Sequence, residues 1–151
     1  MKEVHLIVVG KLKEKNILEL ENDYLKRVKN FSVYIHEVKS GNDDVNQEGL
    51  LVEKKIYSLK KSDPKVYLLS EWGEIQTSQE FSNRLYLCFE NSDQVFFLIG
   101  GAAGHAQNIL SLNHEKISMG KMTYPHKLAR LLFVEQLYRA ETIRLGHPYH
   151  K

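Results

Sequence analysis

Short apolar segments alternate with longer segments of helical periodicity along this chain, and this alternation limits the folds open to it. Val4–Val9 and Gln94–Ile99 are short runs of mainly aliphatic and aromatic residues, a pattern typical of buried strands. Further strands are expected at Val33–Val38, Lys65–Leu69 and around Ile117. Strands that alternate with helices form a mostly parallel sheet with helices packed on its faces. The sequence therefore predicts an α/β fold.

Capping signals mark where the helices begin and end. Asn16 is a suitable N-cap for the first helix, and Thr77 with Glu80 three residues later matches a capping box. Pro125 suits the first position of a long final helix, and Gly146 suits its end. The expected helices cover residues 17–28, 47–60, 78–89, 106–112 and 125–143.

Three loops of the second half are expected at the carboxyl ends of strands, where ligands bind in open α/β sheets. They are Leu69–Gly73, Gly100–His105 and Met119–Tyr124. The glycines of the second loop allow the backbone to approach a ligand closely, although a tight strand-to-helix turn would also need them. This loop lacks both the G-x-G-x-x-G spacing of a dinucleotide site and the Gly-Lys-Ser/Thr of a P-loop.

The final helix is apolar around nearly its whole circumference. A helix of that kind is buried on more than one side, and in so short a chain a homodimer interface is the economical way to bury it. Its charged residues then need partners or ligands, with ordinary ion pairs as the alternative for Arg130, Arg139 and Arg144. The apolar residues are Leu128, Leu131, Leu132, Phe133, Val134, Leu137, Tyr138, Ala140 and Ile143.

Charge is distributed unevenly along the 151 residues. The net charge is +2 overall, but −4 over residues 66–120 and +4 over residues 121–151, so contacts with RNA phosphates are expected at the basic end. No signal-peptide pattern and no apolar run of bilayer length are found, so we expect a cytoplasmic protein without membrane contacts. Cys88 is the only cysteine and the histidines lack metal-ligand spacing, so we expect a core cysteine and no metal site.

The last five residues, His147-Pro148-Tyr149-His150-Lys151, combine aromatic, imidazole and cationic side chains. Such groups stack on bases and neutralise phosphates in RNA-binding proteins. A frayed, indifferent terminus is the alternative.

A set of motifs covers the second half of the chain: Leu69…Gly73, Phe97–Gly104, Ile117–Ser118, Met122–His126, Glu135–Ala140 and His147–Lys151. Their order, spacing and position resemble the RlmH family, whose members are SPOUT-class methyltransferases that modify N3 of a pseudouridine in large-subunit ribosomal RNA. The chain length and the first strand extend the resemblance to the whole chain. The sequence departs from the family pattern at Ser70, Ala103 and His105.

The resemblance implies one SPOUT-type domain over residues 1–151, a trefoil knot in its C-terminal part and a homodimer. It also implies S-adenosylmethionine as the methyl donor and 23S ribosomal RNA, on the assembled ribosome, as the substrate. By motif position, the donor-binding residues are Leu69, Gly100, Gly101, Gly104, Gly120, Lys121, Met122, Thr123, Tyr124 and Pro125.

Residue type and position suggest the remaining roles. N3 of the base loses a proton when it is methylated, so we expect His150 as the base, Tyr149 as an orienting or stacking residue, and Arg139 as the residue that stabilises the anion. Arg130, Arg139 and Lys151 are expected to contact the RNA. A non-catalytic RNA-binding module and a flavodoxin-like binder of phosphates or nucleotides are the alternative functions.

Overall fold

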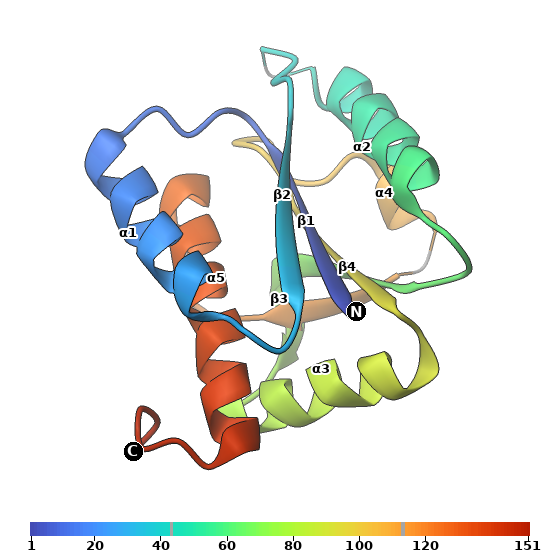
Figure 1. Ribbon diagram of the computed structural model, residues 1–151. Coiled ribbons are helices and arrows are strands. Elements are labelled where there is room, and N and C mark those ends of the chain that lie inside the picture. Colours follow the sequence, from blue (N-terminus) through green and yellow to red (C-terminus); the bar gives the residue numbers. More distant parts are fainter. Residues whose placement is uncertain (43, 113) are drawn as a thin grey trace.

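A five-stranded sheet, with every neighbouring pair of strands parallel, forms the centre of the molecule (Figure 1). The computed structural model describes residues 1–42, 44–112 and 114–151. The strand order is β2-β1-β4-β3-β5, which confirms the predicted parallel α/β architecture. The strands are β1 (Glu3–Val9), β2 (Ser32–Val38), β3 (Lys65–Ile75), β4 (Gln94–Ile99) and β5 (Glu115–Ser118).

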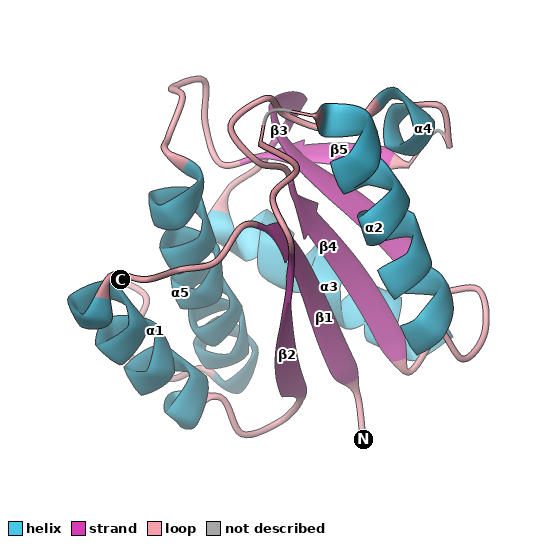
Figure 2. Cartoon of the chain, turned by 90° about the horizontal axis from the view of Figure 1, so that it is seen from above, coloured by secondary structure: helices cyan, strands magenta, loops and turns pink. Residues whose placement is uncertain are grey.

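Helices cover both faces of this sheet (Figure 2). α1, α3 and α5 pack on one face, and α2 with α4 packs on the other. No helix in the described part of the chain is long and apolar enough to cross a membrane. The helices are α1 (Lys15–Arg27), α2 (Val45–Leu59), α3 (Ser78–Asn91), α4 (Gln107–Leu110) and α5 (His126–Leu145).

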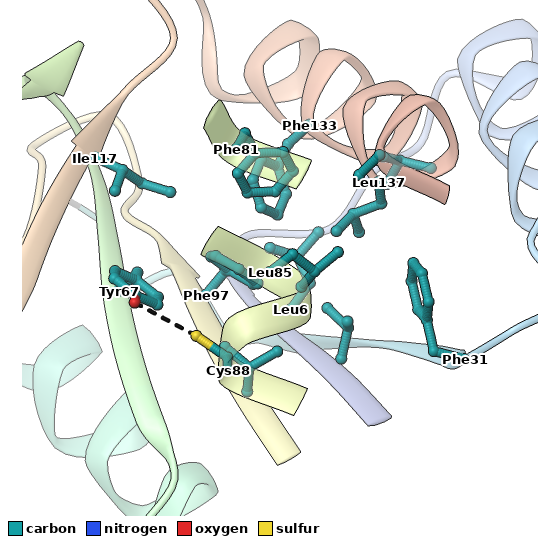
Figure 3. Packing of buried hydrophobic residues seen from close by; sticks show 14 of the residues in the cluster. Leu6, Phe31, Tyr67, Phe81, Leu85, Cys88, Phe97, Ile117, Phe133 and Leu137 are labelled. Carbon is teal, nitrogen blue, oxygen red and sulfur yellow. Dashed lines mark hydrogen bonds between the residues drawn. The ribbon is translucent and has the colours of Figure 1, made fainter. Parts of the chain in front are cut away.

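Two apolar cores lie on the two faces because side chains alternate along each strand. On β4, Phe97 points into the core beneath α3 and α5, whereas Phe96 and Leu98 point towards α2. Figure 3 shows the first of these cores, where the Tyr67 hydroxyl lies 3.4 Å from the buried sulfur of Cys88. Burial on both faces explains why the central strands are apolar at nearly every position. The expected core position of Cys88 is confirmed.

Two of the four capping predictions hold, and that for Pro125 differs by one position, since Pro125 is the N-cap of α5 rather than its first residue. The hydroxyl oxygen of Thr77 accepts a hydrogen bond from the Glu80 amide at 3.1 Å, and Gly146 ends α5 in the left-handed conformation with φ of 69°. Asn16 is not the N-cap of α1, because Glu14 occupies that position. The Glu14 carboxylate forms an ion pair with Lys127 of α5, so a tertiary contact that the local pattern does not contain places the start of α1.

β3 is longer than the sequence indicated. The prediction ended the strand at Leu69 and continued with a loop, but the strand extends to Ile75. Ile117 of β5 pairs with both Leu69 and Glu74, so residues 70–73 form a bulge between the two pairs. Gly73 is required there, because a Cβ atom would lie 2.6 Å from the Ile117 nitrogen.

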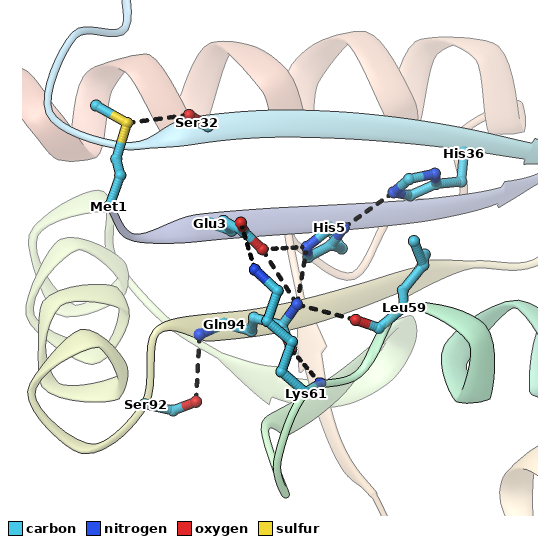
Figure 4. A network of polar contacts seen from close by, with 9 residues as sticks. All are labelled: Met1, Glu3, His5, Ser32, His36, Leu59, Lys61, Ser92 and Gln94. Carbon is cyan, nitrogen blue, oxygen red and sulfur yellow. Dashed lines mark hydrogen bonds and ion pairs between the residues drawn. The ribbon is translucent and has the colours of Figure 1, made fainter.

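A polar network occupies the amino-terminal edge of the sheet (Figure 4). The two ring nitrogens of His5 lie 2.9 Å from the Glu3 carboxylate and 2.9 Å from His36, while Lys61 donates to the same carboxylate at 2.9 Å. Hydrogen bonds from His5 and Lys61 lower the pKa of Glu3 to about 2. Burial, and then the neighbouring His5, lowers the pKa of His36 to about 4.

These shifts predict that acid destabilises the fold in two stages. Between pH 6.5 and about 4, the unfolded chain protonates His36 and the folded chain does not, so the free energy of unfolding falls as the pH falls through this window. Glu3 adds a second loss between pH 4.5 and about 2, because its folded form resists protonation. Urea unfolding of the wild type from pH 8 to pH 4 should show the first decline.

His36→Gln should reduce the decline between pH 6.5 and 4, because it removes a titrating group. His147→Gln is the matched control, since His147 is an exposed histidine outside this network, and its decline should equal that of the wild type. An unchanged decline in His36→Gln would show that the network does not cause the acid sensitivity.

Candidate functional site

The carboxyl ends of β3, β4 and β5 open into a groove of about 920 Å³. This volume falls within the range of small-molecule sites, and the position is the expected one for a parallel sheet. Nine of the ten predicted donor-binding residues line the groove, and Lys121 is the exception. The groove residues include Leu69, Ser70, Glu71, Trp72, Gly100–His105, Gly120, Met122–His126 and Ala129.

The turn after β4 is built from glycines because its backbone folds tightly on itself. The Gly104 amide donates to the Gly101 carbonyl at 2.9 Å, and Gly104 has a φ of +81°, in the left-handed region that favours glycine. A Cβ atom on Gly100 would lie 2.7 Å from the backbone of Gly104. The turn therefore offers backbone groups, rather than side chains, to whatever occupies the groove.

His105 joins this turn to the end of β3. Its Nε2 lies 2.9 Å from the Leu69 carbonyl oxygen, and since a carbonyl only accepts, Nε2 carries the proton. Burial lowers the pKa of His105 and favours the neutral ring, and it outweighs the hydrogen bond to Leu69, which acts in the opposite direction. His105 thus has a structural role, holding two sides of the groove at a set separation.

The opposite rim consists of the β3 bulge and the loop before α5. The Thr123 hydroxyl donates to the Glu71 carboxylate, and this contact joins the two segments. Trp72 and Met122 project from the rim, with 85% and 74% of their surfaces exposed. Gly120 has a φ of +133°, and its amide donates to the Ser118 hydroxyl at 3.0 Å, which shapes the start of the loop.

A second group of predicted residues gathers at the other end of α5. The Tyr149 hydroxyl donates to Glu135 at 2.8 Å, and Arg139 donates to the same carboxylate at 2.6 Å. The Arg139 guanidinium lies 4.7 Å from the centre of the Tyr149 ring. Burial and the bond to Glu135 raise the pKa of Tyr149, and the bond to Glu135 raises that of Arg139. The tail is therefore folded against α5 rather than frayed.

His150 belongs to this tail cluster of Glu135, Arg139, Tyr149 and His150. Its Nδ1 lies 3.1 Å from a terminal nitrogen of Arg139. A guanidinium can only donate, so Nδ1 of His150 is the acceptor in this hydrogen bond. Lys151 follows as the exposed last residue.

Within a single chain, the groove residues and the tail cluster lie far apart. α5 begins at the groove with His126 and rises about 1.5 Å per residue, so Arg139 lies about 20 Å along the helix. Figure 1 shows the C-terminal end beside the far end of α5. The donor-binding candidates and the catalytic candidates are thus separate in the single chain.

Arg130 is buried, although the sequence predicted an RNA contact for it. It is only 6% exposed, and its guanidinium forms two bonds to Glu21, at 2.7 and 2.9 Å, and one to Glu37 at 2.7 Å. This burial corrects the expectation that Arg130 contacts RNA. Taking one partner from a buried ion pair leaves an uncompensated charge, so Arg130 serves to join α5 to α1 and β2.

Sequence reasoning missed Glu71 and Glu48, which lie beside the groove and beneath its glycine turn. Glu71 lies within the predicted Leu69–Gly73 loop but was not singled out there, and Glu48 falls in no motif. Trp72 could have been recognised as a candidate from the sequence, since it is the only tryptophan and lies in a predicted loop. Within residues 1–42, 44–112 and 114–151, no group of three or more His, Cys, Asp or Glu residues is arranged to hold a metal ion.

Comparison with known proteins identifies relatives along nearly the whole chain. A family model described as "Predicted SPOUT methyltransferase" matches residues 1–150. A protein named ribosomal RNA large subunit methyltransferase H from Enterococcus faecalis is 34% identical, covering 98% of this chain and 99% of the relative. Proteins of the same name from Bacteroides fragilis and Lawsonia intracellularis are 39% and 36% identical, covering 96% and 99% of this chain and 96% and 98% of their own lengths.

The single tryptophan makes occupation of the groove measurable. Trp72 lines the groove and is 85% exposed, so a ligand that enters changes the polarity around the indole. Titration with S-adenosylmethionine should change the tryptophan emission to a saturating value. Trp72→Phe should abolish the signal while calorimetry still detects binding. Binding by calorimetry without any change in wild-type emission would place the ligand outside this groove.

Proposed function

This chain belongs to the SPOUT methyltransferase family, and from that premise we propose that it transfers a methyl group from S-adenosylmethionine to N3 of a pseudouridine in 23S ribosomal RNA. The observation that carries the proposal is its full-length similarity to proteins named ribosomal RNA large subunit methyltransferase H. A substrate in ribosomal RNA also supports a cytoplasmic protein that acts on the ribosome.

The groove suits a donor of this kind. Its glycine turn folds so tightly that a Cβ atom on Gly100 would meet the Gly104 backbone, and the rim adds apolar contacts from Met122 and Tyr124. Leu69, the turn at 100–104 and the loop at 120–125 would hold the donor, which supplies an electrophilic methyl group. The protein then mainly binds, positions and excludes water.

The tail cluster suits the other half of the reaction. N3 must lose a proton, and the only lone pair of neutral His150 is the one that Arg139 holds. His150 therefore becomes available as a base once Arg139 turns to another acceptor. An RNA phosphate or the developing N3 anion is such an acceptor, so RNA binding and base activation would be coupled. Lys151 would add a phosphate contact from the exposed terminus.

A second copy of the chain would unite the two halves. The tail lies about 20 Å along α5 from its own groove, so the proposal places the tail of one copy at the groove of the other. Apolar side chains beside the groove support a homodimer, since Leu128 and Leu132 are 42% and 41% exposed on α5. Leu132 also lines a cavity of about 270 Å³ together with Tyr124, Phe133 and polar residues such as Gln136.

We propose that residues 1–151 act as one methyltransferase domain, because a single sheet takes strands from both halves of the chain. The trefoil knot stays a prediction that rests on the family.

The activity can be tested in cells that lack this protein. Mass analysis of their ribosomal RNA should show one methyl group missing from one pseudouridine of the large-subunit RNA, restored by the wild-type gene. Unchanged methylation of every pseudouridine would contradict the proposed function.

Removal of Tyr149–Lys151 should separate catalysis from donor binding. Methylation of ribosomes should be lost, because the proposed base and orienting ring are gone, whereas calorimetry should show donor binding close to that of the wild type. Glu135→Gln is a milder companion variant that loosens Tyr149 and Arg139 without shortening the chain. A truncated protein with full activity would refute the role of the tail.

A further inference from the structure

A buried carboxylate lies directly behind the glycine turn of the groove. Glu48 of α2 is 4% exposed. Its Oε2 accepts hydrogen bonds from the Ser40 hydroxyl at 3.1 Å and from the Gly41 amide at 3.0 Å. These two bonds fix the carboxylate in one orientation.

That other oxygen, Oε1, is buried and has no hydrogen-bond partner among the described residues. A Cβ atom on Gly101 would lie 3.4 Å from Oε1 and 3.5 Å from Oε2, so the carboxylate lies next to the side of Gly101 that carries no side chain. A crevice of about 10 Å³, lined by Glu48, Gly100, Gly104 and His105, holds at most one water molecule. Buried polar atoms are normally paired, so this oxygen calls for an explanation.

No ion pair of Glu48 exists within residues 1–42, 44–112 and 114–151. The contrast with Glu21 is clear, because that buried carboxylate is neutralised by Arg130. The field of an ionised carboxylate that is buried without a counter-charge is weakly screened, so it reaches further than that of a surface charge. Across the glycine turn, this field favours a positive charge in the groove.

We propose that Glu48 is a specificity-determining residue. It makes the groove bind the cationic methyl donor more tightly than the reaction product, whose sulfur is uncharged. The inference rests on the proposed function. S-adenosylmethionine carries a positive sulfonium, and S-adenosylhomocysteine, which remains after methyl transfer, has a neutral thioether at the same atom. The two ligands otherwise present the same groups. A carboxylate behind the turn therefore binds the first more tightly and releases the second.

The position behind the turn also limits a cost to catalysis. The sulfonium loses its charge as the methyl group leaves, so a carboxylate in direct contact would stabilise the bound donor more than the transition state. Glu48 is separated from the groove by the backbone of Gly101, which weakens its attraction without removing it. The arrangement favours exchange of product for donor while it keeps the reaction barrier low.

Calorimetry with both ligands tests this inference without any activity measurement. In Glu48→Gln, the ratio of the product Kd to the donor Kd should fall by about three- to tenfold, because only the donor loses an attraction. Glu53→Gln is the matched control on the same helix, where the carboxylate accepts from Asn108 at 3.0 Å and does not contact the turn. Its ratio should equal that of the wild type.

Glu48→Met removes the charge by a second route and needs no hydrogen bond, so it provides the same test if the glutamine variant fails to fold. Glu48→Asp keeps the charge and should retain the wild-type preference. Equal weakening of both ligands would show that Glu48 only shapes the turn, and would overturn the inference. Absence of donor binding to the wild type would instead refute the proposed function, so the two failures are distinguishable.

Discussion

Parallel pairing of all five strands is the constraint on which the rest of this molecule depends. Strands that run in one direction open their carboxyl ends at one edge, so the bulge of β3 and the segments that follow β4 and β5 become neighbours although they are far apart in the sequence. The details of those segments then serve close approach. The turn at 100–104 folds on glycines, and the bulge at 70–73 pushes Glu71 and Trp72 out to the rim.

α5 gives the site its second half and separates it from the first. The helix starts at the groove and ends beside the tail, and the Arg130 ion pairs with Glu21 and Glu37 hold it against α1 and β2. Its rigid length keeps Tyr149 and His150 away from the groove of the same chain. In the proposed dimer, such a divided site would be completed by the second copy, which would relate the exposed leucines of α5 to catalysis as well as to assembly.

Much of this architecture could be predicted from local patterns, because strands such as Gln94–Ile99 and caps such as Thr77 are determined by their own residues. The failures share a cause in tertiary contacts. Glu14, which pairs with Lys127, is the N-cap of α1 in place of Asn16. β3 extends past Leu69 because it pairs with β5 again beyond the bulge. Arg130 looked like a ligand for phosphate, since its two carboxylate partners lie about a hundred positions away. Nothing in the sequence around Glu48 points to a function, because its proposed role depends on burial next to Gly101, which is a tertiary contact.

Co-expression of two inactive variants tests whether the groove of one copy works with the tail of another. One variant lacks Tyr149–Lys151. The other carries Gly101→Val, and the Cβ atom of that valine would lie 3.0 Å from the Val9 side chain and crowd the turn. Mixed dimers contain one site with an intact groove and an intact tail, so methylation of ribosomes should return in the mixture. A mixture as inactive as either variant alone would contradict a site shared between two copies.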